Sequence, residues 1–170
     1  MKIRVVGQIW YRNFRWGDST APVYDRPESE FWNRYNFITI RNSFPDEAEW
    51  AVPVSGANVL KLCFDDATSD PEGTLILFDE AIARQIAAFL RRIDRDRGLF
   101  INCAAGVSRS GAVGEVLNDY FNRYLEPNEA DDRFFREHNR QICGNPLVRR
   151  ILSGVLFDQP PARKEGGNPS

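Results

Sequence analysis

A thiol and a guanidinium stand in the middle of this chain, at the two ends of a run of small residues. Cys103 follows an apolar stretch, Leu99–Ile101, that is typical of a short buried strand. After Arg109, apolar residues recur at helical spacing: Val113, Val116, Leu117, Tyr120, Phe121 and Tyr124. The sequence therefore predicts a strand, a tight loop and a helix, with the thiol where the loop begins and the guanidinium where it ends.

A loop of this kind suits an anion. Its successive backbone N–H groups can converge on one point, and the N-terminal end of the following helix adds positive potential. Arg109 can close the site with a planar fork of donors that matches two phosphate oxygens. The same field favours a thiolate, so we expect the pKa of Cys103 to lie below that of a free cysteine. A thiolate beneath a bound phosphate is arranged for phosphoryl transfer to sulfur.

The pattern Cys103-x5-Arg109-Ser110 resembles the Cys-x5-Arg-Ser/Thr signature of the cysteine-dependent protein tyrosine phosphatases. The residues at 105–110, Ala-Gly-Val-Ser-Arg-Ser, are most similar to the dual-specificity branch of that family. The resemblance covers most of the chain, but only the stretch Cys103–Gly111 is highly specific. It implies that Cys103 is the nucleophile and that Ser110 assists breakdown of a cysteinyl-phosphate. The phosphate-binding residues that it implies are Ala104, Ala105, Gly106, Val107, Ser108 and Arg109.

Each role has a structural alternative. Cys103 could be a buried structural cysteine, and Arg109 a surface arginine, although a cation at a helix start is unfavourable unless an anion sits there. Ser110 fits a plain helix cap equally well. One departure from the family is Asn102, which stands where the family has histidine. A neutral amide supplies no positive charge but can donate a hydrogen bond that orients the loop, so we expect a less depressed Cys103 pKa than is typical of the family.

The resemblance also implies a general acid, an aspartate from a loop that precedes the catalytic strand. Three residues compete: Asp65, Asp66 and Asp70. Asp66 continues the phase of the apolar positions in the strand predicted at 59–64, so it is the first choice, with Asp65 second and Asp70 third. The alternative is that all three are solvated turn residues.

A second cysteine, Cys63, is predicted on a strand that neighbours the one ending at Cys103. In some family members a second cysteine forms a protective disulfide with the nucleophile. The alternative, a core cysteine, is favoured here. His138 lies on a charged helical stretch, far from any motif, and is assigned no role.

Strands and helices alternate along the chain, which predicts an α/β fold with a central parallel or mixed sheet of four to five strands flanked by helices. Ligands bind such sheets at the carboxyl ends of strands, where the Cys103 loop lies. The predicted strands are 2–6, 37–40, 59–64 and 99–101. The predicted helices are one near 27–35, one from the Asp79 cap to a stop at Gly98, and others at 109–125, 131–142 and from Pro146. Elsewhere in 7–36 we expect loop, with aromatic residues that cover the sheet edge or, as the alternative, line a substrate pocket.

Length and composition set the remaining bounds. We expect one phosphatase-like domain over 1–158 and a disordered tail over 159–170. No signal peptide or bilayer-spanning run is found, and an odd count of three cysteines suits a reducing compartment, so a cytoplasmic monomer is expected. The net charge of −2 favours neither nucleic acid nor a membrane as partner. No metal or cofactor is predicted.

The sequence therefore predicts a phosphate-monoester hydrolase with a cysteinyl-phosphate intermediate and Asp66 as acid. Phosphotyrosine, with phosphoserine and phosphothreonine as further candidates, is the substrate that the resemblance implies. The loop lacks a lysine, which disfavours phosphoinositides. One alternative is a pseudophosphatase that binds phosphorylated ligands with little turnover. Another is a sulfur-transfer enzyme of the rhodanese kind, against which the spacing of Arg109 and Ser110 speaks.

Overall fold

A four-stranded sheet forms the centre of the computed structural model, which describes residues 1–44 and 49–158. All strand pairs are parallel, and the order across the sheet is β1-β4-β2-β3. The strands are β1 (Ile3–Gly7), β2 (Asn36–Arg41), β3 (Val59–Cys63) and β4 (Leu99–Cys103). The predicted α/β fold is confirmed. Of the four to five strands predicted, four form, and the sheet is purely parallel rather than mixed. The predicted tail, 159–170, lies outside the described residues.

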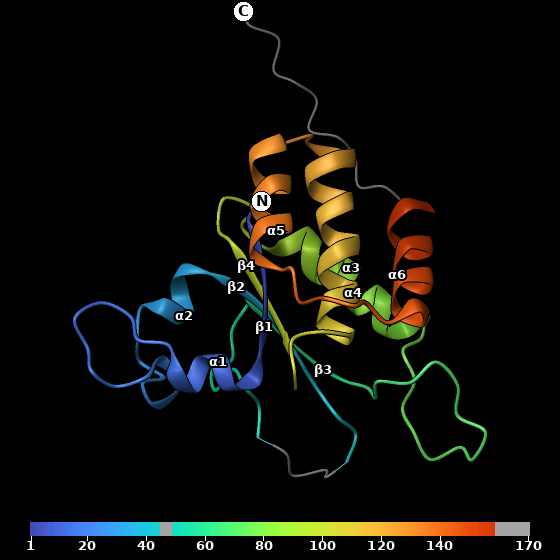
Figure 1. Cartoon of the computed structure of the whole chain (residues 1–170), viewed down its shortest axis with the longest axis horizontal. Helices are drawn as coiled ribbons and strands as arrows, with labels where there is room; N and C mark the ends of the chain where they lie inside the picture. The colour runs from blue at the N-terminus through green and yellow to red at the C-terminus, as the bar shows by residue number, and fades with distance from the viewer. Residues whose placement is uncertain (45–48, 159–170) are drawn as a thin grey trace, which may run out of the picture.

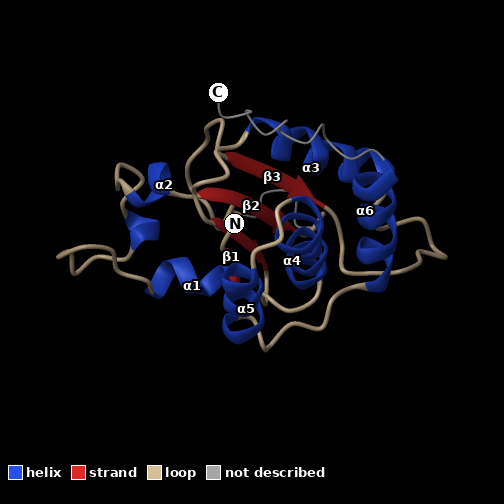
Figure 2. Ribbon diagram, turned by 90° about the horizontal axis from the view of Figure 1, so that it is seen from above, coloured by secondary structure: helices blue, strands red, loops and turns tan. Residues whose placement is uncertain are grey.

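Helices cover both faces of this sheet (Figures 1 and 2). One face carries α1 (Gln8–Asn13), the 3₁₀ helix η1 (Val23–Asp25) and α2 (Phe31–Arg34). The other carries α3 (Glu80–Arg92), α4 (Arg109–Asn118), its π-helical continuation η2 (Asp119–Leu125), α5 (Glu129–His138) and α6 (Pro146–Asp158). Within the described ranges, no helix has both the length and the apolar character that crossing a bilayer requires.

Alternation along the strands divides the core into two parts. Ile101 and Cys103 of β4 point toward α3–α6 and belong to a large, mainly aliphatic core. Phe100, between them, points the other way and packs with rings from the stretch 7–36. Those rings, among them the fully buried Tyr11 and Phe31, form a second, aromatic core. The aromatic residues of the N-terminal stretch therefore cover a face of the sheet at its inner strands β4 and β2, rather than the sheet edge that was expected.

The stretch 7–36 contains three short helices, where the sequence predicts one. Helix α1 begins directly after β1, and its Trp10 stacks on Phe14, the residue that follows the helix, with ring centroids 4.2 Å apart. Tyr11 meanwhile packs against Trp32 at 5.5 Å. A six-residue helix is too short to show a clear period in the sequence, so tertiary packing of the rings decides its formation.

Helix α3 starts as predicted and ends earlier. Asp79 caps it, since its Oδ1 accepts the backbone N–H of Ile82 at 2.9 Å. The prediction that Gly98 stops the helix is wrong, because Ile93 already adopts an extended conformation and places its side chain in the aliphatic core. Gly98 instead allows close packing, since a Cβ there would lie 3.4 Å from the ring of Tyr35.

The prediction that Cys63 lies on a strand next to Cys103 is also wrong, because β2 separates β3 from β4. Two strand spacings amount to about 9.6 Å, beyond the roughly 7 Å between Cα atoms that a disulfide tolerates. The Sγ of Cys63 lies 3.4 Å from the carbonyl oxygen of Asn42, and Cys63, Cys103 and Cys143 are all free thiols.

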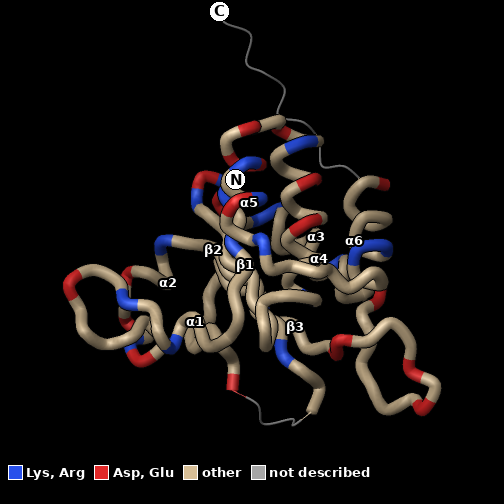
Figure 3. Tube along the Cα trace, in the orientation of Figure 1, with Lys and Arg blue, Asp and Glu red and all other residues tan. Residues whose placement is uncertain are grey.

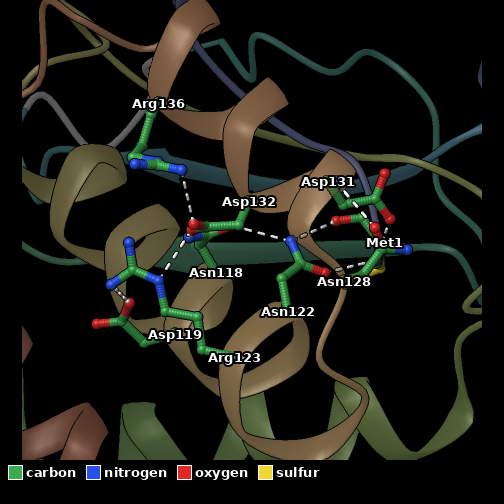
Figure 4. Close-up of polar contacts among 9 residues, drawn as sticks. All are labelled: Met1, Asn118, Asp119, Asn122, Arg123, Asn128, Asp131, Asp132 and Arg136. Atoms are coloured by element: carbon green, nitrogen blue, oxygen red, sulfur yellow. Dashed lines mark hydrogen bonds and ion pairs between the residues drawn. The ribbon is translucent and has the colours of Figure 1, made fainter.

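The helix predicted at 109–125 is divided into α4 and the π-helix η2, and a polar network fastens η2 to α5 (Figure 4). Asp132 accepts hydrogen bonds from Asn118 at 2.6 Å and from Arg123 at 2.9 Å, and it pairs with Arg136. Burial alone would raise the pKa of Asp132, but these donors outweigh it and lower the pKa. Asn139, at the end of α5, bonds β1 by accepting the N–H of Val5. Helix α5 ends at His138, whereas the sequence predicted a helix that continues to residue 142.

Charged residues of both signs are spread along the trace (Figure 3). Acidic positions recur in the loop between β3 and α3, which leaves the sheet at its carboxyl edge and projects to one side of the molecule in this view. This loop carries the three candidate acids, Asp65, Asp66 and Asp70.

The close approach of α4 to β1 can be tested with a matched pair of glycines. A Cβ at Gly114 would lie 2.6 Å from Val5 Cγ2 and 3.2 Å from the ring of Phe135, whereas a Cβ at the exposed Gly154 of α6 would meet nothing within 4 Å. We expect Gly114→Ala to lower the free energy of unfolding by about 1–3 kcal/mol, and Gly154→Ala to raise it by about 0.5–1 kcal/mol. Urea unfolding followed by tryptophan fluorescence measures both. Equal changes in the two variants would contradict this packing.

Candidate active site

The loop at 104–108 joins β4 to α4 and rests against the end of β1. Gly106 has φ +75°, in the left-handed region that glycine tolerates, and a Cβ there would lie 2.4 Å from the backbone nitrogen of Gly7. A Cβ at Gly7 would in turn meet the carbonyl oxygen of Ala105 at 2.9 Å. The two glycines therefore allow two backbones to touch, which fixes the path of the loop.

Carbonyl groups of the loop are bonded outward. Ala104 O accepts from Gln8 N (3.1 Å), Gly106 O from Gln141 Nε2 (3.4 Å), Val107 O from Cys143 N (3.1 Å), and Ser108 O from Ala112 N (2.9 Å) and Asn145 N (3.2 Å). In a trans peptide the C=O and the next N–H point in opposite directions. Outward carbonyls therefore turn the N–H groups that follow them toward the centre of the loop, where they can receive an anion.

The Cys103 thiol lies at the base of this loop. Its Sγ is 3.1 Å from Ser110 Oγ, and the residue is buried. Burial alone would raise the pKa of Cys103, but the hydroxyl and N–H of Ser110, the N–H of Gly106 and the charge of Arg109 together outweigh it and lower the pKa. The alternative of Ser110 as a helix cap is wrong, because Ser108 occupies the N-cap position of α4.

Arg109 is a buried cation with unused hydrogen-bonding capacity. Only 4% of the residue is exposed, and its Nη1 donates to the carbonyl oxygen of Phe64 at 2.7 Å. Its Nε is buried without a hydrogen-bond partner, and no ion pair joins Arg109 to an acid among the residues that the structure describes. A buried charge in this state is costly unless an anion completes its shell. The surface-arginine alternative is therefore wrong.

Among the three candidate acids, Asp66 is the one that contacts the loop. Its Oδ1 accepts from Ser108 Oγ at 2.7 Å and from Asn145 Nδ2 at 2.9 Å. The side chain is otherwise exposed at the rim of the loop. An exposed carboxyl group anchored through one oxygen suits a residue that gives a proton to a bound substrate.

Asp65 and Asp70 hold their own loops instead. The carboxylate of Asp65 accepts from the N–H and hydroxyl of Ser43 and from the N–H of Ile76. Burial would raise the pKa of Asp65, but the bonds from Ser43 lead the effects that lower it. Asp70 accepts the N–H of Leu75 at 2.7 Å, and this bond is the main cause of a lowered pKa there. Within the described residues, the hydrogen bonds of both carboxylates go to their own turns and to Ser43, and none goes to the Cys103 loop.

Asn102, one residue before the thiol, lies on the opposite side of β4 from Cys103. It is buried, and its Oδ1 has no hydrogen-bond partner among the described residues. Its register partner on β2, Thr39, is buried too, and its Oγ1 likewise lacks a partner there. The amide oxygen and the hydroxyl therefore both face the aromatic core, and the expected role of Asn102 in orienting the loop stays a prediction.

The sequence did not indicate the residues that support the loop from distant parts of the chain. Gly7, Gln141 and Asn145 all contact it or its partners, although they come from the end of β1 and from the segment between α5 and α6. An asparagine before Pro146 does signal a helix start. No sequence signal indicates that the same amide reaches Asp66. The described residues contain no cluster of three or more His, Cys, Asp or Glu side chains arranged for a metal ion.

Because its pKa is lowered, Cys103 should be alkylated at a lower pH than a free cysteine. A depressed pKa keeps the thiolate present at lower pH, so the rate of iodoacetamide modification of Cys103 should reach half its maximum below pH of about 8.5, the value for a free cysteine. Ser110→Ala should shift this midpoint upward, because it removes the hydroxyl donor. The measurement uses a Cys143→Ser background, since Cys143 is exposed, and locates the modification by mass spectrometry. A midpoint at or above that of a free cysteine would contradict the geometry.

No protein-family model matches this sequence, and no curated protein matches it by sequence similarity. Solved structures do match. The PTP-2 phosphatase of Cydia pomonella has a TM-score of 0.49 at 16% identity, over 90% of this chain and 84% of that one. Tk-PTP in its active form has a TM-score of 0.47 at 15% identity, over 92% and 94%. The human tyrosine phosphatase-like serine/threonine/tyrosine-interacting protein has 0.44 at 15%, over 71% and 75%.

These similarities are distant, with every TM-score below 0.5 and identities of 15–16%. They indicate neither a substrate nor turnover, so the chemistry has to come from the loop itself. What the chain shares with Tk-PTP and the Cydia pomonella PTP-2 phosphatase is a distant similarity of fold.

Proposed function

We propose that this protein hydrolyses phosphate monoesters through a cysteinyl-phosphate intermediate. The observation that carries the proposal is the buried guanidinium of Arg109, which forms no ion pair with an acid among the described residues and lies beside a thiol whose pKa is lowered. Together with the inward N–H groups of the loop, it supplies the dense positive potential that a phosphoryl transition state requires. Uncatalysed monoester hydrolysis is among the slowest reactions known, so this density is needed.

In the first step, the Cys103 thiolate attacks phosphorus and the bond from phosphorus to the leaving oxygen breaks. Arg109 and the loop N–H groups hold the equatorial oxygens. Asp66, at the rim, gives a proton to the leaving oxygen. The alcohol or phenol departs, and the phosphoryl group remains on sulfur.

In the second step, water attacks the phosphorus of the cysteinyl-phosphate and Asp66, now a carboxylate, takes a proton from that water. The bond between sulfur and phosphorus breaks, and inorganic phosphate leaves. The thiolate that reappears is stabilised by Ser110, whose Oγ lies 3.1 Å from Sγ. The contact supports the hydroxyl as a donor to sulfur in this step.

Phosphotyrosine proteins are the proposed substrates, with phosphoserine and phosphothreonine as further candidates. The exposed rim residues Ala104 and Ala105 are small and neutral, so the loop fits a single phosphate on a protein side chain and offers no lysine to a second phosphate. This argument disfavours multiply phosphorylated lipids.

A second candidate function is a binding module that captures phosphorylated ligands with little turnover. It is favoured by Asn102, because a neutral amide facing the aromatic core brings no positive charge to Cys103. The loop would still bind phosphate through Arg109, so binding alone does not separate the two functions. Turnover does.

Hydrolysis of phenyl phosphate, whose basic phenolate leaving group needs a proton, tests the proposed roles. Cys103→Ser should reduce turnover to background, because a hydroxyl is not ionised by this site. Asp66→Asn should lower kcat by about 10²-fold or more, the usual contribution of a general acid. Asp70→Asn is the matched control, since its amide oxygen can still accept the N–H of Leu75.

Outcomes separate the candidates. Cys103-dependent turnover that survives Asp70→Asn and drops in Asp66→Asn supports the hydrolase. Wild-type protein that binds a phosphotyrosine peptide without Cys103-dependent turnover is instead a binding module. Thiosulfate-dependent sulfur transfer would overturn both candidates.

A further inference from the structure

Asn145 joins three segments that are far apart in the sequence. It is 4% exposed, and its Oδ1 accepts the N–H groups of Leu147 at 2.9 Å and Val148 at 3.3 Å, which caps α6. Its Nδ2 donates to Asp66 Oδ1 at 2.9 Å and to the carbonyl oxygen of Ala67 at 3.4 Å. Its backbone N–H donates to the carbonyl oxygen of Ser108 at 3.2 Å. One residue thus fixes α6, the phosphate loop and the Asp66 loop relative to one another.

The orientation of this amide is set by its neighbours. Leu147 and Val148 present backbone N–H groups, which need an acceptor, and Ala67 presents a carbonyl, which needs a donor. A flipped amide would face donors with donors and acceptors with acceptors. The NH₂ group of Asn145 must therefore point at Asp66.

Both hydrogen bonds to the Asp66 side chain end on the same oxygen. Ser108 Oγ and Asn145 Nδ2 donate to Oδ1 at 2.7 Å and 2.9 Å. A serine hydroxyl can rotate and accept instead of donating, but an amide NH₂ only donates. A proton on Oδ1 would therefore face the Asn145 donor, whereas a proton on Oδ2 leaves both hydrogen bonds intact.

We infer that Asn145 is a positioning residue for the general acid: it reserves Oδ1 of Asp66 as an acceptor and so places the transferable proton on Oδ2. The inference rests on the proposed function and deepens it. In the first step the proton moves from Oδ2 to the leaving oxygen, and in the second step Oδ2 takes a proton from the attacking water. The amide also prevents the carboxyl group from rotating, so each turnover begins with the same oxygen presented to the substrate.

The test compares two aryl phosphates whose leaving groups differ in their need for a proton. p-Nitrophenolate leaves readily without protonation, whereas the more basic phenolate depends on the acid. Asn145→Ser keeps a good helix cap for α6 and removes the reach of the NH₂ group to Asp66. We expect kcat/KM for phenyl phosphate, which reports on the first step, to fall about tenfold, part of the general-acid contribution, and kcat/KM for p-nitrophenyl phosphate to change less than about twofold.

A second variant protects the test against loss of folding. Asn145→Asp keeps the size and the cap, but it replaces the NH₂ group with an oxygen that repels Asp66, so the same selective loss should be larger. The pH midpoint of Cys103 alkylation, which reports on the phosphate loop, should stay unchanged in Asn145→Ser, which adds no charge.

Equal losses of kcat/KM with the two substrates, or a shifted Cys103 midpoint in Asn145→Ser, would show a merely structural role for Asn145 and overturn the inference. Unchanged kinetics in both variants would overturn it as well. In either case the proposed hydrolase would stand, because wild-type turnover would still depend on Cys103. A wild-type protein without Cys103-dependent turnover would overturn the proposed function and the positioning role together.

Discussion

The buried guanidinium of Arg109 is the constraint on which the rest of this structure depends. A cation at the first turn of α4 opposes the helix dipole, and its Nε lacks a hydrogen-bond partner among the described residues. The carbonyl of Phe64 supplies one neutral contact and no charge. Because both the dipole and the guanidinium call for negative charge at the same point, the loop is organised for an anion, and the lowered pKa of the Cys103 thiol is the first consequence of that field.

The scaffold keeps the field in place by fastening the loop from outside. Its carbonyl groups are bonded to the start of α1, to α4 itself and to the segment that precedes α6, while Gly7 and Gly106 allow two backbones to meet. These partners lie far apart in the sequence and meet at the carboxyl edge of one parallel sheet. A rigid frame of this kind lets N–H groups face an anion before it arrives, which is how preorganised sites stabilise charge.

Much of this could be predicted from local pattern. The apolar run before Cys103 and the helical spacing after Arg109 identified β4, the loop and α4, because each signal is local and strong. The phase of β3 also singled out Asp66 over Asp65, and the structure places Asp66 on the loop. Other features were beyond local reasoning. Whether Cys63 neighbours Cys103 depends on strand order, and the six-residue α1 depends on aromatic packing. The reach of Asn145 to Asp66 depends on how α6 docks, which no spacing encodes.

The most direct test of the central claim is a crystal structure of the wild-type protein with orthovanadate, a tetrahedral oxyanion that can bond to sulfur. The account predicts vanadium on Cys103 Sγ, with equatorial oxygens bonded to the N–H groups of the loop and to the guanidinium of Arg109. It also predicts an apical oxygen facing Asp66. An empty loop, or vanadate bound elsewhere while the N–H groups splay apart, would contradict it.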